Sequence, residues 1–159
     1  MKIKINYFLL IIFIVATSCG FKVVDQSKLI NFSINEIISN GDKRINYKIK
    51  NKVLFKAKTR ENKNKIINLN LTTKKVKDIK EKNIKNEITK YQIRIETKVN
   101  IDGLNIEAPA EFSISKSGDF KVGIQHSQTL NNEKALVELL SETLADEIVS
   151  EIIFKLNDI

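Results

Sequence analysis

The chain has 159 residues, of which 27 are basic and 19 acidic, for a formal net charge of +8. This length suits a single domain behind an export signal, and 42% apolar residues allow a modest hydrophobic core. One cysteine and one histidine exclude an intrachain disulfide and leave no cluster with metal-ligand spacing.

The first twenty residues, MKIKINYFLLIIFIVATSCG, have the layout of an export signal. Two lysines precede ten consecutive apolar residues, Tyr7 to Ala16. As a helix this run would be about 15 Å long, whereas the core of a bilayer is roughly 30 Å thick. We therefore predict a signal peptide over residues 1–18 and no membrane span.

Small residues follow the apolar run and end at the only cysteine, Cys19. The stretch ATSC resembles a bacterial lipobox, whose cysteine receives a diacylglycerol, becomes the new N-terminus and is then N-acylated. An ordinary secretory signal beside a stray thiol is the alternative. By the same resemblance Gly20 favours the outer membrane, because in most lipoprotein sorting systems an aspartate at this position retains the protein at the inner membrane. Two or three acyl chains would hold the protein stably, with residues 19–28 as the acylated tether.

A single domain is expected over residues 29–159. Its first element is a half-buried strand at Leu29–Ile37, where apolar and polar residues alternate. The SNGD stretch at residues 39–42 offers turn chemistry and a helix N-cap. Residues 43–58 fit both a helix, with apolar residues four apart, and a strand, with alternation. Periodicity leaves that segment open.

Further strands follow in the middle of the chain. Alternation predicts one at residues 67–73, after which the lysine-dense residues 74–87 are expected to fray into a connection. The clearest alternation covers residues 91–102. Asp102-Gly103 then predicts a hairpin turn, with a return strand over residues 104–114.

The last part of the sheet contains the only proline and a second turn signal. Pro109 indicates an edge strand or a bulge. The SKSGD stretch at residues 115–119 predicts a turn, and Phe120, Val122 and Ile124 a further short strand.

A long helix closes the chain, with Asn131 or Asn132 as its cap. Apolar residues recur every four positions from Leu136 to Leu156, which indicates a stripe that faces the core. The element order predicts an α+β two-layer sandwich, with the second face of the sheet polar and open to water or a partner.

Charge is divided unevenly along the chain. Residues 43–90 hold 17 basic and 4 acidic side chains, a net of +13, whereas residues 91–159 hold 6 basic and 12 acidic, a net of −6. A cationic edge attracts partners that carry phosphate; a merely solvated lysine-rich surface is the alternative. Nucleic acid is not an expected partner, because the protein is exported and has only three arginines.

No catalytic site is predicted. His126 is the only histidine, and Glu107 and Glu111 would lie about 13 Å apart along one strand. That separation is too wide for two carboxylates that act on one bond. We expect no enzymatic activity, no metal and no cofactor other than the covalent lipid on Cys19.

Three stretches together resemble the lipopolysaccharide-assembly lipoprotein family, the small lipoproteins that plug the outer-membrane lipopolysaccharide translocon. They are CGF at residues 19–21, the strand TKYQIRIETKVNI with its hairpin partner, and the helix NNEKALVELL…ADEIVSEIIFKL. The resemblance covers nearly all of the 141 residues from Cys19 onward. It implies a mainly antiparallel four-stranded sheet covered on one face by two helices, which makes residues 43–58 a helix.

The resemblance also implies a non-enzymatic function. Members sit inside a large outer-membrane β-barrel, help it to assemble, and bind lipopolysaccharide on its way to the outer leaflet. The candidate binding residues are lysines near the connection between the second and third strands: Lys77, Lys80, Lys82 and Lys85. One departure is that the approach to the last helix, SQTLNNE, carries no lysine. The alternative function is a periplasm-facing lipoprotein that pilots or scaffolds another envelope complex, such as a secretin or a lipid-transport system.

Overall fold

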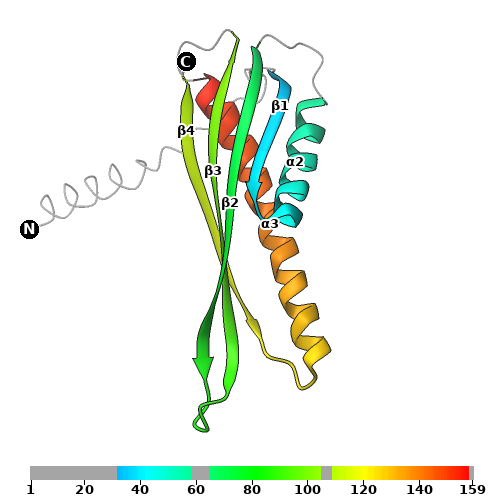
Figure 1. Ribbon diagram of the computed structural model, residues 1–159, viewed down its shortest axis with the longest axis vertical. Helices are drawn as coiled ribbons and strands as arrows, with labels where there is room; N and C mark the ends of the chain where they lie inside the picture. Colours follow the sequence, from blue (N-terminus) through cyan, green and yellow to red (C-terminus); the bar gives the residue numbers. More distant parts are fainter. Residues whose placement is uncertain (1–31, 59–64, 105–108, 158–159) are drawn as a thin grey trace, which may run out of the picture.

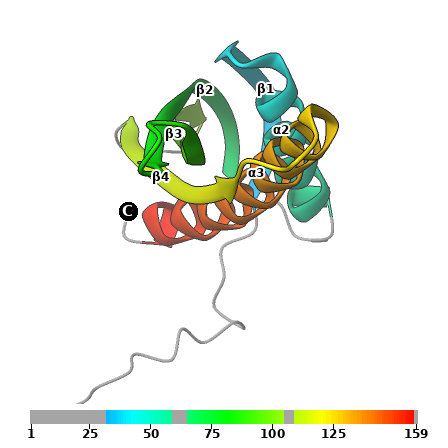
Figure 2. The same cartoon turned by 90° about the horizontal axis from the view of Figure 1, so that it is seen from below.

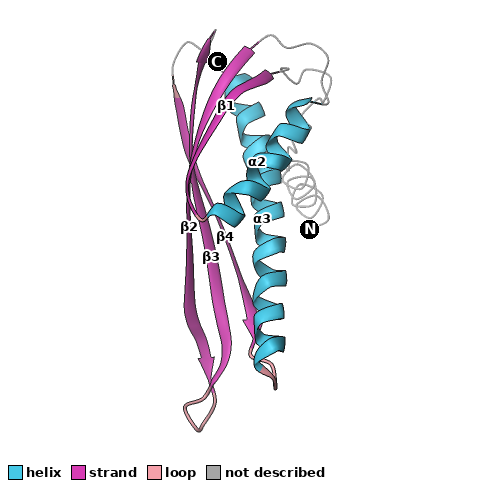
Figure 3. Ribbon diagram, turned by 45° about the vertical axis from the view of Figure 1, so that its right-hand side comes forward, coloured by secondary structure: helices cyan, strands magenta, loops and turns pink. Residues whose placement is uncertain are grey.

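The structure is a computed structural model that describes residues 32–58, 65–104 and 109–157. Its elements are β1 (Phe32–Gly41), α2 (Lys43–Lys58), β2 (Lys65–Lys82), β3 (Ile88–Leu104), β4 (Ala110–Lys121) and α3 (His126–Asn157). The strands form one sheet in the order β1-β2-β3-β4, in which only the β1–β2 pair is parallel. Both helices lie on one face of this sheet (Figures 1 and 3), so the predicted α+β fold is confirmed.

The molecule is elongated (Figure 1). At one end lie the start of β1 and the C-terminal end of α3; at the other lie the turn between β2 and β3 and the start of α3. Figure 2 looks along this axis and shows α3 against β4, with α2 nearer to β1. None of the described helices is long and apolar enough to cross a membrane.

Helix α2 confirms the helical alternative for residues 43–58. The Asp42 carboxylate accepts hydrogen bonds from the backbone N–H groups of Arg44 and Ile45, at 3.0 and 3.2 Å, as an N-cap does. Ile45, Ile49 and Val53 form its buried stripe. The helix also has a topological cause, because parallel strands such as β1 and β2 cannot be joined by a tight turn.

Strand β1 follows the predicted alternation only at its start. Phe32 is buried, but the register shifts between Ile34 and Glu36, so that Ile37 reaches the core. The strand continues to Gly41, four residues past its predicted end. The predicted residues before Phe32 lie outside the described part.

Around β3, one predicted connection is shorter than expected and one predicted turn was wrong. The hairpin connection expected within residues 74–87 is present, but it occupies only residues 83–87. Residues 74–82 do not fray: they continue β2, which pairs with β3 as far as Lys82 opposite Ile88. The regular alternation of β3 provides a complete partner strand there. Asp102 and Gly103 lie inside β3, not in a turn. A Cβ on Gly103 would lie 2.2 Å from the Ile66 carbonyl oxygen, so this glycine permits a close strand approach.

The predicted turn at residues 115–119 was also wrong, because β4 runs unbroken through it. Gly118 lies opposite Ile93, and a Cβ there would come within 2.7 Å of a Leu136 methyl carbon. This glycine therefore makes room for α3. Phe120 is buried in β4, but Val122 and Ile124 are exposed beyond its end. Exposed Pro109 directly precedes β4, which is an edge strand as predicted.

Helix α3 begins at His126, so Asn131 and Asn132 are not its caps. Its first turn is supported by the Thr129 hydroxyl, which accepts a hydrogen bond from the Gly123 N–H at 2.9 Å. The apolar stripe is core, as predicted. Its most buried members, all 7% exposed or less, are Leu140, Leu144, Ile148, Ile152 and Leu156.

Candidate functional site

The predicted site residues fall in three places. Cys19 and the predicted signal peptide before it lie outside the described residues. Lys80 and Lys82 stand at the end of β2, and Lys85 lies in the turn that follows. Lys77 is separate, because its side chain turns towards α3. The structure therefore brings three of the four predicted lysines to one end of the molecule (Figure 1).

We call this end the distal tip and define it as residues 79–90 together with residues 121–125. The two segments are adjacent, since the Val122 N–H donates to the Thr89 carbonyl at 3.0 Å. Ile84 and Ile124 are fully exposed here, and Ile79 is half exposed. Apolar and cationic side chains thus share one surface, a combination suited to an amphiphilic partner.

The lysines of the distal tip differ in whether their ammonium groups already have a partner within the protein. Glu81 pairs with Lys90 at 3.0 Å, and the Lys82 ammonium donates to the Asn86 side-chain oxygen at 3.0 Å. Within the described residues, Lys80 and Lys85 have no ion pair. Among the four predicted lysines, these two therefore carry the charges most available to an anionic ligand.

Lys77 has partners inside the protein. Its nitrogen lies 2.5 Å from a Glu133 carboxylate oxygen and 4.4 Å from the centre of the Tyr91 ring. Tyr91 is stacked on Phe120, with ring centres 5.6 Å apart. The ammonium is thus held between an anion and an aromatic face, which joins β2 to the first turns of α3.

The uneven charge of the sequence is matched within the fold only in part. Acidic residues of α3 pair with lysines of α2, β2 and β4, which lie beside it. The pairs are Lys48–Glu138, Lys52–Asp146, Lys75–Glu133, Lys77–Glu133 and Lys116–Glu147. The cationic surface is therefore smaller than the net charge of residues 43–90 indicates.

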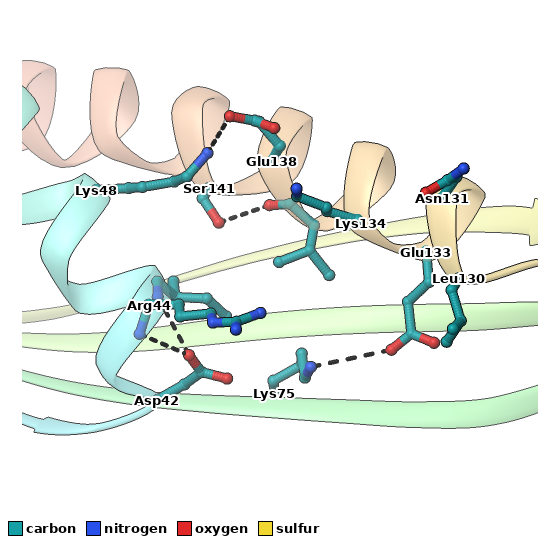
Figure 4. A pocket seen from close by; sticks show the side chains of 12 residues that line it. Asp42, Arg44, Lys48, Lys75, Leu130, Asn131, Glu133, Lys134, Glu138 and Ser141 are labelled. Atoms are coloured by element: carbon teal, nitrogen blue, oxygen red, sulfur yellow. Dashed lines mark hydrogen bonds and ion pairs between the residues drawn. The ribbon is translucent and has the colours of Figure 1, made fainter. Parts of the chain in front are cut away.

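A pocket of about 530 Å³ opens between the start of α2, β2 and the N-terminal half of α3 (Figure 4). Ile45, Val137 and Leu130 supply its apolar wall. Its charged lining comprises Asp42, Arg44, Lys48, Lys75, Glu133, Lys134 and Glu138. The hydrogen bond and positive charge of Lys48, with a smaller contribution from Lys134, lower the pKa of Glu138, which stays ionised at neutral pH.

Comparison with solved structures identifies the fold. Rare lipoprotein B of Shewanella oneidensis has a TM-score of 0.57 at 13% identity, over 74% of this chain and 93% of that one. Lipoprotein B of Nitrosomonas europaea has a TM-score of 0.58 at 12% identity, over 84% of this chain and 90% of that one. A minor lipoprotein of Acinetobacter baumannii has a TM-score of 0.51 at 15% identity, over 78% of this chain and 92% of that one. The chain has the fold of these lipoproteins. No family model and no curated protein matches its sequence.

The part of this lipoprotein fold that the structure describes contains no group of three or more His, Cys, Asp or Glu residues able to hold a metal. His126 is exposed at the first residue of α3. Glu107 lies outside the described residues, so its distance from Glu111 is not defined by the structure.

Sequence reasoning missed Ile84 and the pocket. Ile84 lies in NIKN, a short polar stretch with no alternation, and only the turn geometry exposes it. The pocket brings together residues from three segments far apart in the chain, and no local pattern in the sequence marks them. Two exposed cations of its wall that have no ion pair among the described residues, Arg44 and Lys134, come from different helices.

Proposed function

We propose that the chain is an outer-membrane lipoprotein that plugs the lipopolysaccharide translocon barrel, assists its assembly, and binds lipopolysaccharide during insertion into the outer leaflet. The observation that carries the proposal is the fold shared with rare lipoprotein B over 93% of that chain. The lipobox-like stretch before Cys19 and the family resemblance of the sequence support it independently.

The arrangement of the molecule suits this role. Phe32, the first described residue, begins β1 at the end opposite the distal tip (Figure 1). β2 has 18 residues and so spans about 60 Å. A protein anchored at its N-terminal end would therefore carry Lys80, Lys82 and Lys85 far from the anchor. Lysine binds phosphate as a compact point charge, which suits the phosphates of lipid A.

The face of the sheet away from the helices also suits a barrel interior. Arg94, Glu96, Lys98 and Asn100 are exposed there along β3. Lys98 pairs with Glu111 of β4 at 2.5 Å, so charges of both signs alternate on this face. A polar surface of this kind can meet the hydrophilic lumen of a large barrel without burying apolar side chains.

Affinity purification in mild detergent tests the proposal. Tagged full-length protein would be recovered from outer membranes and its partners identified by mass spectrometry. We expect one large β-barrel protein in roughly equimolar amount, and loss of outer-membrane recovery in the matched Cys19→Ala variant. Recovery of secretin or inner-membrane transport components instead would overturn the proposal in favour of a scaffold for another envelope complex.

A further inference from the structure

The pocket between α2, β2 and α3 is distinct from the distal tip, and its wall has two kinds of surface. Val137 and Ile45 form an apolar floor, and Leu130, half exposed, stands at its side. The volume of about 530 Å³ falls within the range of roughly 300–1,000 Å³ found for small-molecule sites. It suits a ligand with one chain and one small headgroup, and is too small for a lipid with several chains.

The charges around the pocket are only partly matched by one another. Lys48 pairs with Glu138. The Glu133 carboxylate oxygens lie 4.0 Å from the Lys75 nitrogen and 2.5 Å from the Lys77 nitrogen, so Glu133 forms ion pairs with both lysines. The Asp42 carboxylate is engaged by the first turn of α2. All three carboxylates of the pocket wall therefore already have partners within the protein.

Two cations of the wall remain without an ion pair among the described residues. They are Arg44 of α2 and Lys134 of α3, both exposed. In Figure 4 the Arg44 side chain extends from α2 into the space between α3 and β2. An anion there would meet a guanidinium, which can hold two phosphate oxygens at once, and an ammonium from the facing helix.

We infer that this pocket binds an amphiphile in which one phosphate group is joined to one acyl chain. The phosphate lies between Arg44 and Lys134, and the chain lies along Leu130 and Val137. The ligand can be a free monoacyl phospholipid, or one phosphate and one chain of a larger glycolipid. The inference does not rest on the proposed function, since it uses no tip residue and requires no barrel.

Photolabelling tests the site directly. Full-length protein in phosphatidylcholine nanodiscs is exposed to lysophosphatidic acid with a diazirine near the end of its chain, and labelled peptides are mapped by mass spectrometry. We expect labels in residues 130–141 and 44–48. Labelling there should fall roughly tenfold in Arg44→Gln/Lys134→Gln. It should persist in Lys74→Gln/Arg94→Gln, which loses one lysine and one arginine charge from exposed residues outside both the pocket and the distal tip.

A second probe and a displacement experiment show whether the labelling depends on the phosphate charge and which kind of lipid occupies the site. A lysophosphatidylcholine probe with the same chain should label the pocket weakly, because its headgroup has no net charge. Displacement of the probe by unlabelled lipid A would assign the site to a glycolipid. Displacement by lysophosphatidic acid alone would assign it to a monoacyl phospholipid. Either result supports the site. Equal labelling by both probes, or labelling that both double variants retain, would overturn it. Unchanged circular dichroism would show that the Arg44/Lys134 variant is folded.

Discussion

The Lys77 ammonium nitrogen lies 2.5 Å from a Glu133 carboxylate oxygen, although 56 positions separate the two residues in the chain. The pair joins the middle of β2 to the start of α3, next to the stacked rings of Tyr91 and Phe120. It also distinguishes Lys77 from Lys80 and Lys85, which have no ion pair among the described residues.

A double-mutant cycle on Lys77 and Glu133 should give a coupling free energy of about 1 kcal/mol. The pair is partly shielded, with the Glu133 side chain 21% exposed. Lys77→Ala should cost more than Glu133→Gln, because it also removes the contact with the Tyr91 ring. Urea unfolding of the four proteins provides the measurement. Strictly additive effects would show that the ion pair does not stabilise the fold.

The tip lysines are expected to contribute to lipopolysaccharide binding. Lys80→Ala/Lys82→Ala/Lys85→Ala should weaken binding roughly tenfold, since three exposed charges each contribute modestly, and added salt should reduce the difference. Lys77→Ala is the matched comparison and should retain binding. The assay is capture of lipopolysaccharide by the immobilised full-length protein. Undiminished capture by the triple variant would show that the tip lysines do not contribute to lipopolysaccharide binding.

Thr73 and Thr97 share a hydrogen bond of 2.9 Å between their hydroxyls, deep between the sheet and the helices. They are 3% and 0% exposed and lie directly opposite each other on β2 and β3. Thr97→Val alone leaves the other hydroxyl unpaired and should cost about 1–3 kcal/mol. The double variant to valine should recover most of that loss. A double variant as unstable as the sum of the single ones would contradict this interpretation in chemical denaturation.

Gly41 is expected to tolerate no side chain. Its φ angle is +97°, and an added Cβ would lie 1.9 Å from the Thr73 carbonyl oxygen. Gly41→Ala should therefore cost at least about 2 kcal/mol. The adjacent Asp42→Ala removes only the N-cap and should cost about 1 kcal/mol. Thermal unfolding that ranks the two variants in the opposite order would show that the β1–α2 junction relaxes without difficulty.

The elements with strong periodicity were predictable from the sequence. The stripe of α3 and the alternation of β3 identify their buried faces correctly, because each strand or helix buries one face. The identity of residues 43–58 was not decided by pattern. The deciding factor is topological: β1 and β2 are parallel, and a helix must connect them.

The errors came from glycines and from weakly patterned strands. Gly103 and Gly118 lie in sequences typical of turns, yet both serve close packing, one against β2 and the other against Leu136. The end of β2 lacks alternation because almost every residue after Thr73 is exposed, so neither face there is buried, and β3 supplies the hydrogen bonds of the strand. Tertiary contacts of this kind leave no local signal.

The candidate site was predictable only in part. The lysine-rich stretch pointed to the region of the tip, but the sequence does not show that Lys77 turns inward while Lys80 and Lys85 stay unpaired. Nor does it show that Ile84 joins them at the surface. These differences arise from the pairing of β2 with β3 and from the position of α3.

Photo-crosslinking from the distal tip in living cells tests the central claim most directly. A p-benzoylphenylalanine replaces Ile84, which is fully exposed at the tip, or Phe154, which is 52% exposed near the opposite end. After irradiation, the tagged protein is purified and probed for covalently attached lipopolysaccharide. The account predicts an adduct from position 84 and none from position 154. No adduct from position 84, or equal adducts from both positions, would contradict it.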